Sequence, residues 1–223
     1  MKKRLDMNNI LGQGHCKRAL EVAAVGNHSL LLIGPHKSGK WALAERFSTI
    51  YGNGTVLFKI RKEDAYIQNN IARNHKGVMI ATMLPCPCGN FTDPKHDCNC
   101  TPQDIQKHLL SIPSKVLERV AMHVEVPILN LNLLSDKRRG ESSAEIRLRA
   151  EKARLNPKPK KLDKEADELM KMAILELGIH SASYDKIISI AATIAQMDNK
   201  PIIECHHLSE AISYRSLDRN LWG

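Results

Sequence analysis

Residues 29–41 constrain the fold more than any other part of the sequence. An unbroken apolar run, residues 30–33, ends at Gly34, and the loop behind it carries Gly39 and Lys40. This spacing is typical of a phosphate-binding loop that joins a buried strand to a helix. The sequence therefore predicts an α/β fold, with a P-loop core built on a parallel sheet and followed by a small helical domain.

The residue types of this loop fit the chemistry of phosphate binding. Glycines let the backbone curl so that its N–H groups converge on phosphate oxygens, and the next helix directs its positive end at the same anion. Lysine adds a full charge. We therefore assign ATP or phosphate binding to Gly34, Pro35, His36, Lys37, Ser38, Gly39, Lys40 and Trp41. The alternative is a glycine turn that binds no ligand.

Trp41 departs from the pattern of an active loop. Such a loop has Ser or Thr after its lysine, because a hydroxyl must enter the octahedral shell of Mg²⁺. The indole of Trp41 offers no oxygen. We expect the loop to bind phosphate weakly and to lack a ligand for the magnesium ion that hydrolysis requires.

The rest of the chain predicts two domains and a linker. Apolar runs at 55–60, 78–83 and 122–126 indicate further strands, and the span 40–83 is short for a nucleotide-hydrolysing sheet. Two prolines and repelling lysines in 156–161 indicate an extended connection. We divide the chain into a shortened core (1–155, with a cysteine-rich loop at 84–101), a linker (156–162) and a helical lid of three helices (163–223).

The apolar runs indicate where in the cell the protein is located, and that location indicates the redox state of its cysteines. The basic N-terminus has no apolar core behind it, and no later run approaches membrane-spanning length. We expect a cytoplasmic protein without a membrane partner. In that compartment the six cysteines are better interpreted as thiols or metal ligands than as disulfides.

Four of these cysteines form two Cys-x-Cys pairs on a loop rich in Gly, Pro, Asp and Asn. The pairs are Cys86 with Cys88, and Cys98 with Cys100; His96 is a further candidate ligand. Four thiolates can occupy the corners of the tetrahedron that zinc accepts, and binding would order a long loop. The alternative is a set of reduced thiols in a flexible loop.

The formal charge of +9 is unevenly distributed. Between Lys137 and Lys164 there are eleven Lys or Arg and four Asp or Glu, a net charge of +7. Nucleic acid could bind here, because phosphate contacts release counterions. The alternative is a solvated helix face and linker. The candidate contacts are Lys137, Arg138, Arg139, Arg147, Arg149, Lys158, Lys160 and Lys161.

Several motifs together resemble one family. They are Ile10-Leu11-Gly12-Gln13, the loop entry Leu-Leu-Leu-Ile-Gly-Pro, Pro85-Cys86-Pro87-Cys88-Gly89-Asn90, Leu117-Glu118-Arg119-Val120, Glu141-Ser142-Ser143-Ala144 and the segment 207–219. In this order they are similar to the magnesium-chelatase-like AAA+ ATPases of the competence protein ComM type. The resemblance implies an AAA+ core with a helical lid, ring assembly, ATP binding and a role as a DNA motor in recombination.

Four positions depart from the family pattern. Trp41 replaces the magnesium-binding hydroxyl, and a cationic side chain in 56–61 replaces the final acid of the Leu-Asp-Glu strand. Leu84 replaces an Asn that senses the terminal phosphate, and Ser183 stands where the lid contributes an Arg. Arg119 remains, and the resemblance implies that it reaches a neighbouring subunit's phosphate.

These losses lead to three hypotheses. The first is a degenerate AAA+ subunit that binds ATP weakly, hydrolyses little or none, and assembles with itself, an active relative or nucleic acid. The second is an active motor in which Glu63 or Asp64 supplies the metal ligands. The third is a metal-stabilised remnant that binds no nucleotide. Loss of one stabilising group slows catalysis by about 10²–10³, so we expect four losses to abolish turnover.

Overall fold

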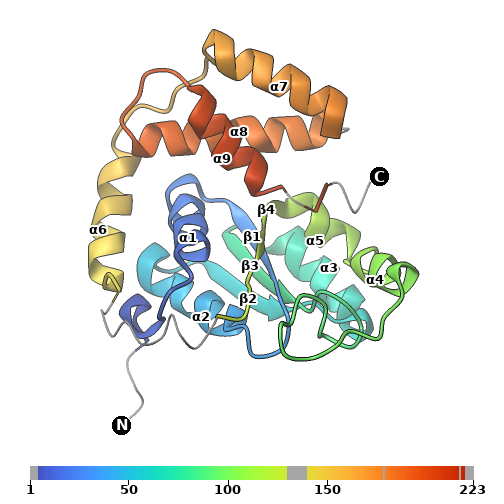
Figure 1. Ribbon diagram of the computed structural model, residues 1–223. Coiled ribbons are helices and arrows are strands. Elements are labelled where there is room, and N and C mark those ends of the chain that lie inside the picture. Colours follow the sequence, from blue (N-terminus) through green and yellow to red (C-terminus); the bar gives the residue numbers. More distant parts are fainter. Residues whose placement is uncertain (1–4, 130–139, 178, 216, 219–223) are drawn as a thin grey trace.

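A computed structural model describes residues 5–129, 140–177, 179–215 and 217–218 (Figure 1). Its centre is a four-stranded sheet of β1 (Ser29–Ile33), β2 (Thr55–Lys59), β3 (Val78–Met83) and β4 (Val120–Glu125). The strand order is β2-β3-β1-β4, and every pair is parallel. The carboxyl ends of all four strands therefore meet at one edge of the sheet.

Both faces of the sheet are covered, which explains the continuous apolar sequences of its central strands. On one face, Leu30 and Leu32 pack with α1 (Gly14–Gly26) and α2 (Lys40–Tyr51). On the other, Leu31 and Ile33 pack with α3 (Ala65–Asn74), α4 (Pro102–Leu109) and α5 (Ser114–Arg119). Two short 3₁₀ helices, η1 (Met7–Asn9) and η2 (Lys62–Asp64), precede α1 and α3.

The C-terminal part is helical and lies against the α1 side of the sheet (Figure 1). It contains α7 (Lys164–Leu177), α8 (Ser181–Met197) and α9 (Cys205–Ser213), while α6 (Ser143–Arg154) runs beside α1 and α2. An ion pair between Arg18 and Glu210 at 3.0 Å joins α1 to α9. The apolar faces of these helices continue the core of the sheet.

After α9 the chain returns to the sheet beside β4. The backbone N–H of His123 donates to the carbonyl of Tyr214 at 2.6 Å. The buried Arg215 then pairs with Asp218 and donates to the hydroxyl of Ser183 at 3.1 Å. Helix α8 begins at Ser181, so Ser183 lies in its first turn.

The predicted fold class is confirmed: a parallel sheet with helices on both faces carries a phosphate loop after β1, and a helical domain follows. Within the described ranges, no helix is long and apolar enough to cross a membrane.

Candidate phosphate loop and cysteine cluster

The loop after β1 has the backbone conformation of an anion cradle. Lys37 and Gly39 both have positive φ, at 63° and 86°, and such alternation turns successive N–H groups toward one concave side. Gly39 is also the N-cap of α2 and provides no side-chain cap, so the first-turn N–H groups of that helix point toward the loop. The sequence prediction of a strand, loop and helix at this position is correct.

Gly34 and Ser38 are closely packed against each other within the loop. A Cβ atom on Gly34 would lie 2.3 Å from the carbonyl oxygen of Val126 and 2.9 Å from Oγ of Ser38, so only glycine fits. Ser38 is 5% exposed, and its hydroxyl has no hydrogen-bond partner among the described residues. A buried hydroxyl without a partner is costly, and here it lies inside the loop.

The side chain of Lys40 contacts the start of the loop at Pro35. Its ammonium donates to the carbonyl oxygen of Pro35 at 2.9 Å, which uses one of its three N–H donors. Burial, and then the charge of Lys59, lower the pKa of Lys40 to about 8. His36 and Lys37 are exposed on the outer side of the loop.

Lys59 approaches the loop from the end of β2. Its Nζ atom lies 4.8 Å from the centroid of the Trp41 ring, within the range of a cation–π contact. The sequence indicated a cation in place of an acid near this point, but it did not predict this contact. Two ammonium groups and an indole therefore lie at the carboxyl edge of the sheet.

Carboxylates do not gather at the loop. In the described part of the chain, two groups of three or more His, Cys, Asp or Glu side chains lie close enough to share an ion, and both lie elsewhere than Glu63 and Asp64. Glu63 is exposed on η2. Glu125 ends β4 and lines a cavity together with Gly34.

Two cavities flank the loop. One, of about 290 Å³, lies between the segment before α1 and the start of α2; Leu11, Ser38 and Leu43 are among its walls. Gln13 links the loop to the segment after β4, since its amide donates to the carbonyls of Pro127 at 2.8 Å and Ser38 at 3.4 Å. The other, of about 500 Å³, lies between the ends of β1 and β4, the cysteine-rich loop and α4.

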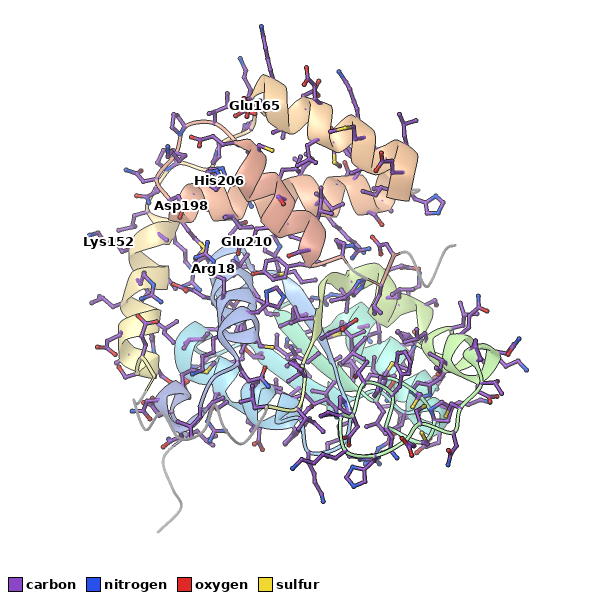
Figure 2. The ribbon with its side chains drawn as sticks, viewed as in Figure 1. Arg18, Lys152, Glu165, Asp198, His206 and Glu210 are labelled. Atoms are coloured by element: carbon purple, nitrogen blue, oxygen red, sulfur yellow. The ribbon has the colours of Figure 1, made fainter. Side chains whose placement is uncertain are left out.

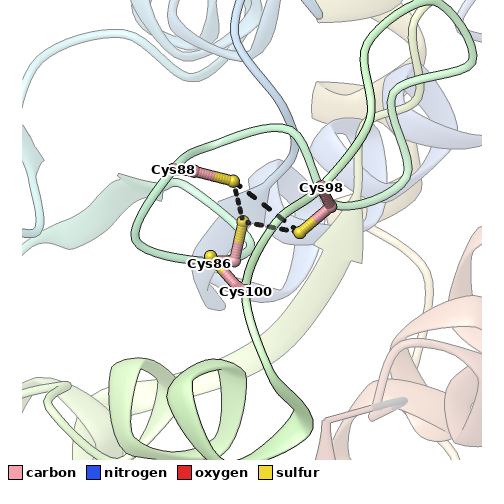
Figure 3. Close-up of side chains that lie close together, drawn as sticks. All are labelled: Cys86, Cys88, Cys98 and Cys100. Atoms are coloured by element: carbon pink, nitrogen blue, oxygen red, sulfur yellow. Dashed lines mark hydrogen bonds between the residues drawn. The ribbon is translucent and has the colours of Figure 1, made fainter.

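The four predicted metal ligands converge (Figure 3). The sulfur atom of Cys86 lies 3.4 Å from that of Cys88 and 3.7 Å from that of Cys98, and all four sulfur atoms, Cys100 included, lie within 4.8 Å of one another. Zn–S bonds of ~2.3 Å place the sulfurs of a tetrahedral site about 3.8 Å apart. The cluster therefore has the ligand type and spacing of a zinc site.

Backbone donors favour a thiolate at Cys88, whereas the pKa values of Cys98 and Cys100 are raised. The N–H of Phe91 donates to the sulfur of Cys86 at 3.4 Å. The N–H of Asn90, and then the thiol of Cys86, lower the pKa of Cys88 to about 6. A thiolate at neutral pH is the form that binds a metal ion. His96 instead pairs with Asp93 at 2.9 Å and is not part of the four-sulfur group.

The family positions outside the loop have structural partners. The guanidinium of Arg119 donates to the carbonyls of Ala72, His75 and Gly77, at and beyond the end of α3. Leu84 follows β3, and its carbonyl accepts from His108 at 3.0 Å. The hydroxyl of Ser183 accepts a hydrogen bond from Arg215. The structure thus places Arg119 against its own chain.

The predicted nucleic-acid residues separate into three groups. Lys137, Arg138 and Arg139 lie outside the described residues. Arg147 pairs with Glu151 at 2.8 Å, and Arg149 bridges Glu141 and the buried Glu21 at 2.6 Å each. Lys158, Lys160 and Lys161 of the linker are exposed, and partial burial of the Lys158 ammonium lowers its pKa.

The surface where α1, α6, α8 and α9 meet carries both signs of charge (Figure 2). Arg18 and Lys152 lie near Asp198 and Glu210 in that view, and a cavity of about 410 Å³ there is lined by Arg18, Glu21, Lys152 and Asp198 among others. Since acids and bases alternate on this surface, the +7 segment does not form a uniformly basic face here.

Asp198, His206 and His207 form a second compact group, at the end of α8 and the start of α9. The Nδ1 atom of His207 accepts the N–H of Glu204 at 2.9 Å, so in the neutral ring the proton resides on Nε2. That Nε2 lies 3.3 Å from Asp198. A metal ion at Nε2 would require the opposite tautomer, and the group is therefore better explained as a helix cap with an ion pair.

Comparison with protein families gives two matches. The family described as magnesium chelatase, subunit ChlI, matches residues 6–61 and 65–134, and the C-terminal family of the same subunit matches residues 150–215. The first match contains the phosphate loop and Cys86, Cys88, Cys98 and Cys100. Together the matches extend over most of the chain.

Individual relatives share 25% to 26% sequence identity with this chain. Competence protein ComM of Haemophilus influenzae is 26% identical over 317 residues, covering 99% of this chain and 62% of that protein. The uncharacterized proteins YifB of Escherichia coli and Salmonella typhimurium are 25% and 26% identical over 312 residues, covering 97% of this chain and 61% of each protein. The chain thus spans about three fifths of these relatives, which also contain additional residues within the aligned region.

Proposed function

The chain belongs to the magnesium chelatase ChlI family, and we propose that it is a member that binds ATP through residues 34–41 with little or no hydrolysis. In this proposal it acts as a binding or assembly subunit, with itself or with an active AAA+ relative. The family resemblance that the sequence predicted is confirmed by these matches.

One observation carries the proposal: groups that bind anions surround the loop, and among the described residues no cluster of three or more metal-binding side chains lies beside it. The backbone cradle, Lys40 and the start of α2 favour phosphate. Trp41 and Lys59 occupy the side of the loop where a metal ion needs oxygen ligands. Phosphoryl transfer depends almost wholly on positioning and charge neutralisation, so such a site supports binding better than turnover.

The 290 Å³ cavity supports a place for the nucleoside. It lies against Ser38 and Gly39 and is walled by Ile10, Leu11 and Leu43. Ligand sites of small molecules are typically apolar clefts of roughly 300–1,000 Å³. We propose that the base and ribose bind here, with the phosphates extending into the loop.

Zinc is the metal that best fits the cysteine cluster. Four sulfurs at this spacing suit a closed structural site and leave no open position for a substrate. We propose that zinc orders the loop between β3 and α4.

We also propose the division of the chain into a core that ends at residue 155 and a helical domain that begins at residue 163. We further propose that Arg119 acts on the phosphate of a neighbouring subunit. This role requires its guanidinium to leave the carbonyls at the end of α3.

ATP titration by calorimetry tests the binding function. The wild-type chain is expected to bind ATP, and Lys40→Ala to lose most of this affinity. Lys76→Ala is a matched control, because Lys76 is exposed at the opposite, amino edge of the sheet just before β3. Absence of ATP binding to the folded wild-type chain would contradict the proposal and favour a metal-stabilised remnant.

A second function, an active ATP-driven DNA motor, has one structural observation in its favour. Glu125 lines the 500 Å³ cavity together with Gly34 and could act on a bound phosphate. One relative is named for competence, the ComM of Haemophilus influenzae. If this function holds, the chain hydrolyses ATP, and Glu125→Gln abolishes hydrolysis while ATP binding persists.

A further inference from the structure

Lys59 and the phosphate loop converge on one edge of the sheet. In the order β2-β3-β1-β4, β2 is separated from β1 by one strand, and the parallel strands bring their carboxyl ends together. Lys59 is the last residue of β2, and the loop begins directly after β1. Helix α2 contacts both β2 and β3, and Lys59 lies 4.8 Å from the ring of Trp41 at the start of that helix.

The indole fixes the direction of that lysine. Trp41 is the second residue of α2, and its ring face carries the Lys59 ammonium. A cation–π contact of this kind favours one orientation of a flexible side chain. The residue that removes the magnesium ligand therefore also positions a positive charge beside the loop.

The positive charge of Lys59 also acts on Lys40 in the loop. Burial, and then repulsion by the charge of Lys59, lower the pKa of Lys40 to about 8. Like charges repel, and an anion bound in the loop relieves the repulsion between the two lysines.

We infer that Lys59 takes over the role of a magnesium ion, so that the loop selects metal-free polyphosphate, such as free ATP or tripolyphosphate, over its magnesium complex. This inference rests on the proposed function, since it concerns the form of ligand that the same loop binds. Magnesium neutralises two phosphate charges and carries ordered water, so it removes the attraction to Lys59 and finds no protein oxygen at Trp41.

Ser38 offers independent support for an anion at this place. Its hydroxyl is buried, lies 2.9 Å from the position of a Cβ on Gly34, and has no partner among the described residues. A phosphate oxygen in the loop is an acceptor that such a hydroxyl can use. Ser38, Lys40 and Lys59 together provide a neutral donor and two cations.

The test is a set of calorimetric titrations of the full chain with ATP and with tripolyphosphate, each in excess EDTA and in excess magnesium. The wild type is expected to bind both ligands more tightly in EDTA. Lys59→Met keeps the apolar stem and removes the charge; it should weaken metal-free binding about tenfold or more, the effect of one charged hydrogen bond, and abolish the preference for the metal-free form. Lys59→Glu should reverse that preference.

Lys62→Met is the matched control, because Lys62 is an exposed lysine three residues further on and should leave all affinities unchanged. Tighter binding of the magnesium complex by wild type, or equal affinities of Lys59→Met and wild type for free ATP, overturns the role of Lys59 while leaving the binding function intact. Failure of the wild type to bind either ligand in either condition overturns the proposed function itself, and this inference with it.

Discussion

The backbone N–H of His36 donates a hydrogen bond of 3.2 Å to the carbonyl oxygen of Gly89. This bond joins the phosphate loop to the turn that carries Cys86 and Cys88. Gly89 has φ of +78°, and a Cβ atom there would lie 2.3 Å from Nε2 of His36. The cysteine cluster and the phosphate loop are therefore in direct contact, and a change in one should be measurable in the other.

Metal removal is expected to weaken nucleotide binding. Without a metal ion the turn at Gly89 loses its anchor, and the loop loses the bond at His36. One hydrogen bond contributes about 1 kcal/mol, so we expect ATP affinity to fall about fivefold when zinc is chelated or in Cys86→Ser. Elemental analysis should find about one zinc per wild-type chain, by the four-ligand geometry.

Cys205→Ser is the control for this experiment, since Cys205 lies at the start of α9 outside the cluster. It should retain both zinc and ATP affinity. Reduced wild-type protein that contains no metal would contradict the zinc site, and full ATP affinity after chelation would contradict the coupling.

Gly34→Ala should destabilise the fold. The new Cβ would lie 2.3 Å from the backbone carbonyl oxygen of Val126, and this strand end cannot move without disturbing β4. Overpacking of this kind costs about 1–3 kcal/mol. Gly14→Ala is the matched control, because nothing lies within 4 Å of its Cβ. Urea unfolding measures both, and equal stability of the two variants would contradict the close packing of the loop.

Much of the fold follows from local sequence patterns. Strand β3 spans Val78–Met83, as its apolar run predicts, because a strand buried on both faces needs a continuous apolar sequence. The strand, loop and helix around Gly34 follow from glycine and lysine spacing. Helix α6 begins where the local pattern Ser142-Ser143-Ala144-Glu145 forms a capping box.

The contacts within the candidate site could not be predicted in the same way. Arg149 pairs with Glu21, 128 residues away, and Lys59 reaches Trp41 only because β2 is placed beside β3. A charge count treats Arg149 as available to nucleic acid, whereas the structure uses it to join α6 to α1. Long-range pairing depends on strand order, which local periodicity does not contain.

Stability should fall as the pH decreases below about 6.5. His28 is buried and bonded to the hydroxyl of Thr193 at 2.9 Å; burial, and then the charge of Lys158, lower its pKa to about 3. An unfolded histidine has a pKa of about 6.5. Between these values the unfolded chain binds a proton that the folded chain excludes, so this contribution is complete above 6.5 and is lost toward pH 3.

Urea unfolding between pH 5 and 7 measures this effect. One such group changes the free energy of unfolding by about 1.4 kcal/mol per pH unit. His28→Gln should show a shallower slope than wild type by about that amount, while His36→Gln, at an exposed position, should not. Identical slopes for wild type and His28→Gln would refute the assignment.

Nucleic-acid binding, if it uses the linker, should depend on Lys160 and Lys161. Each exposed cation that contacts a phosphate contributes about 0.9 to the slope of log affinity against log salt. The double variant Lys160→Ala/Lys161→Ala should therefore reduce the slope for duplex DNA by about 2. Arg147→Ala should change it less, because Arg147 already pairs with Glu151. An affinity that does not vary with salt would end this hypothesis.

Steady-state ATP hydrolysis over a range of magnesium concentrations tests whether the loop binds phosphate but lacks the groups that hold magnesium for hydrolysis. We expect phosphate release at the background rate for wild type, with no difference from Lys40→Ala at any magnesium concentration. Magnesium-dependent turnover by wild type that Lys40→Ala abolishes would contradict it.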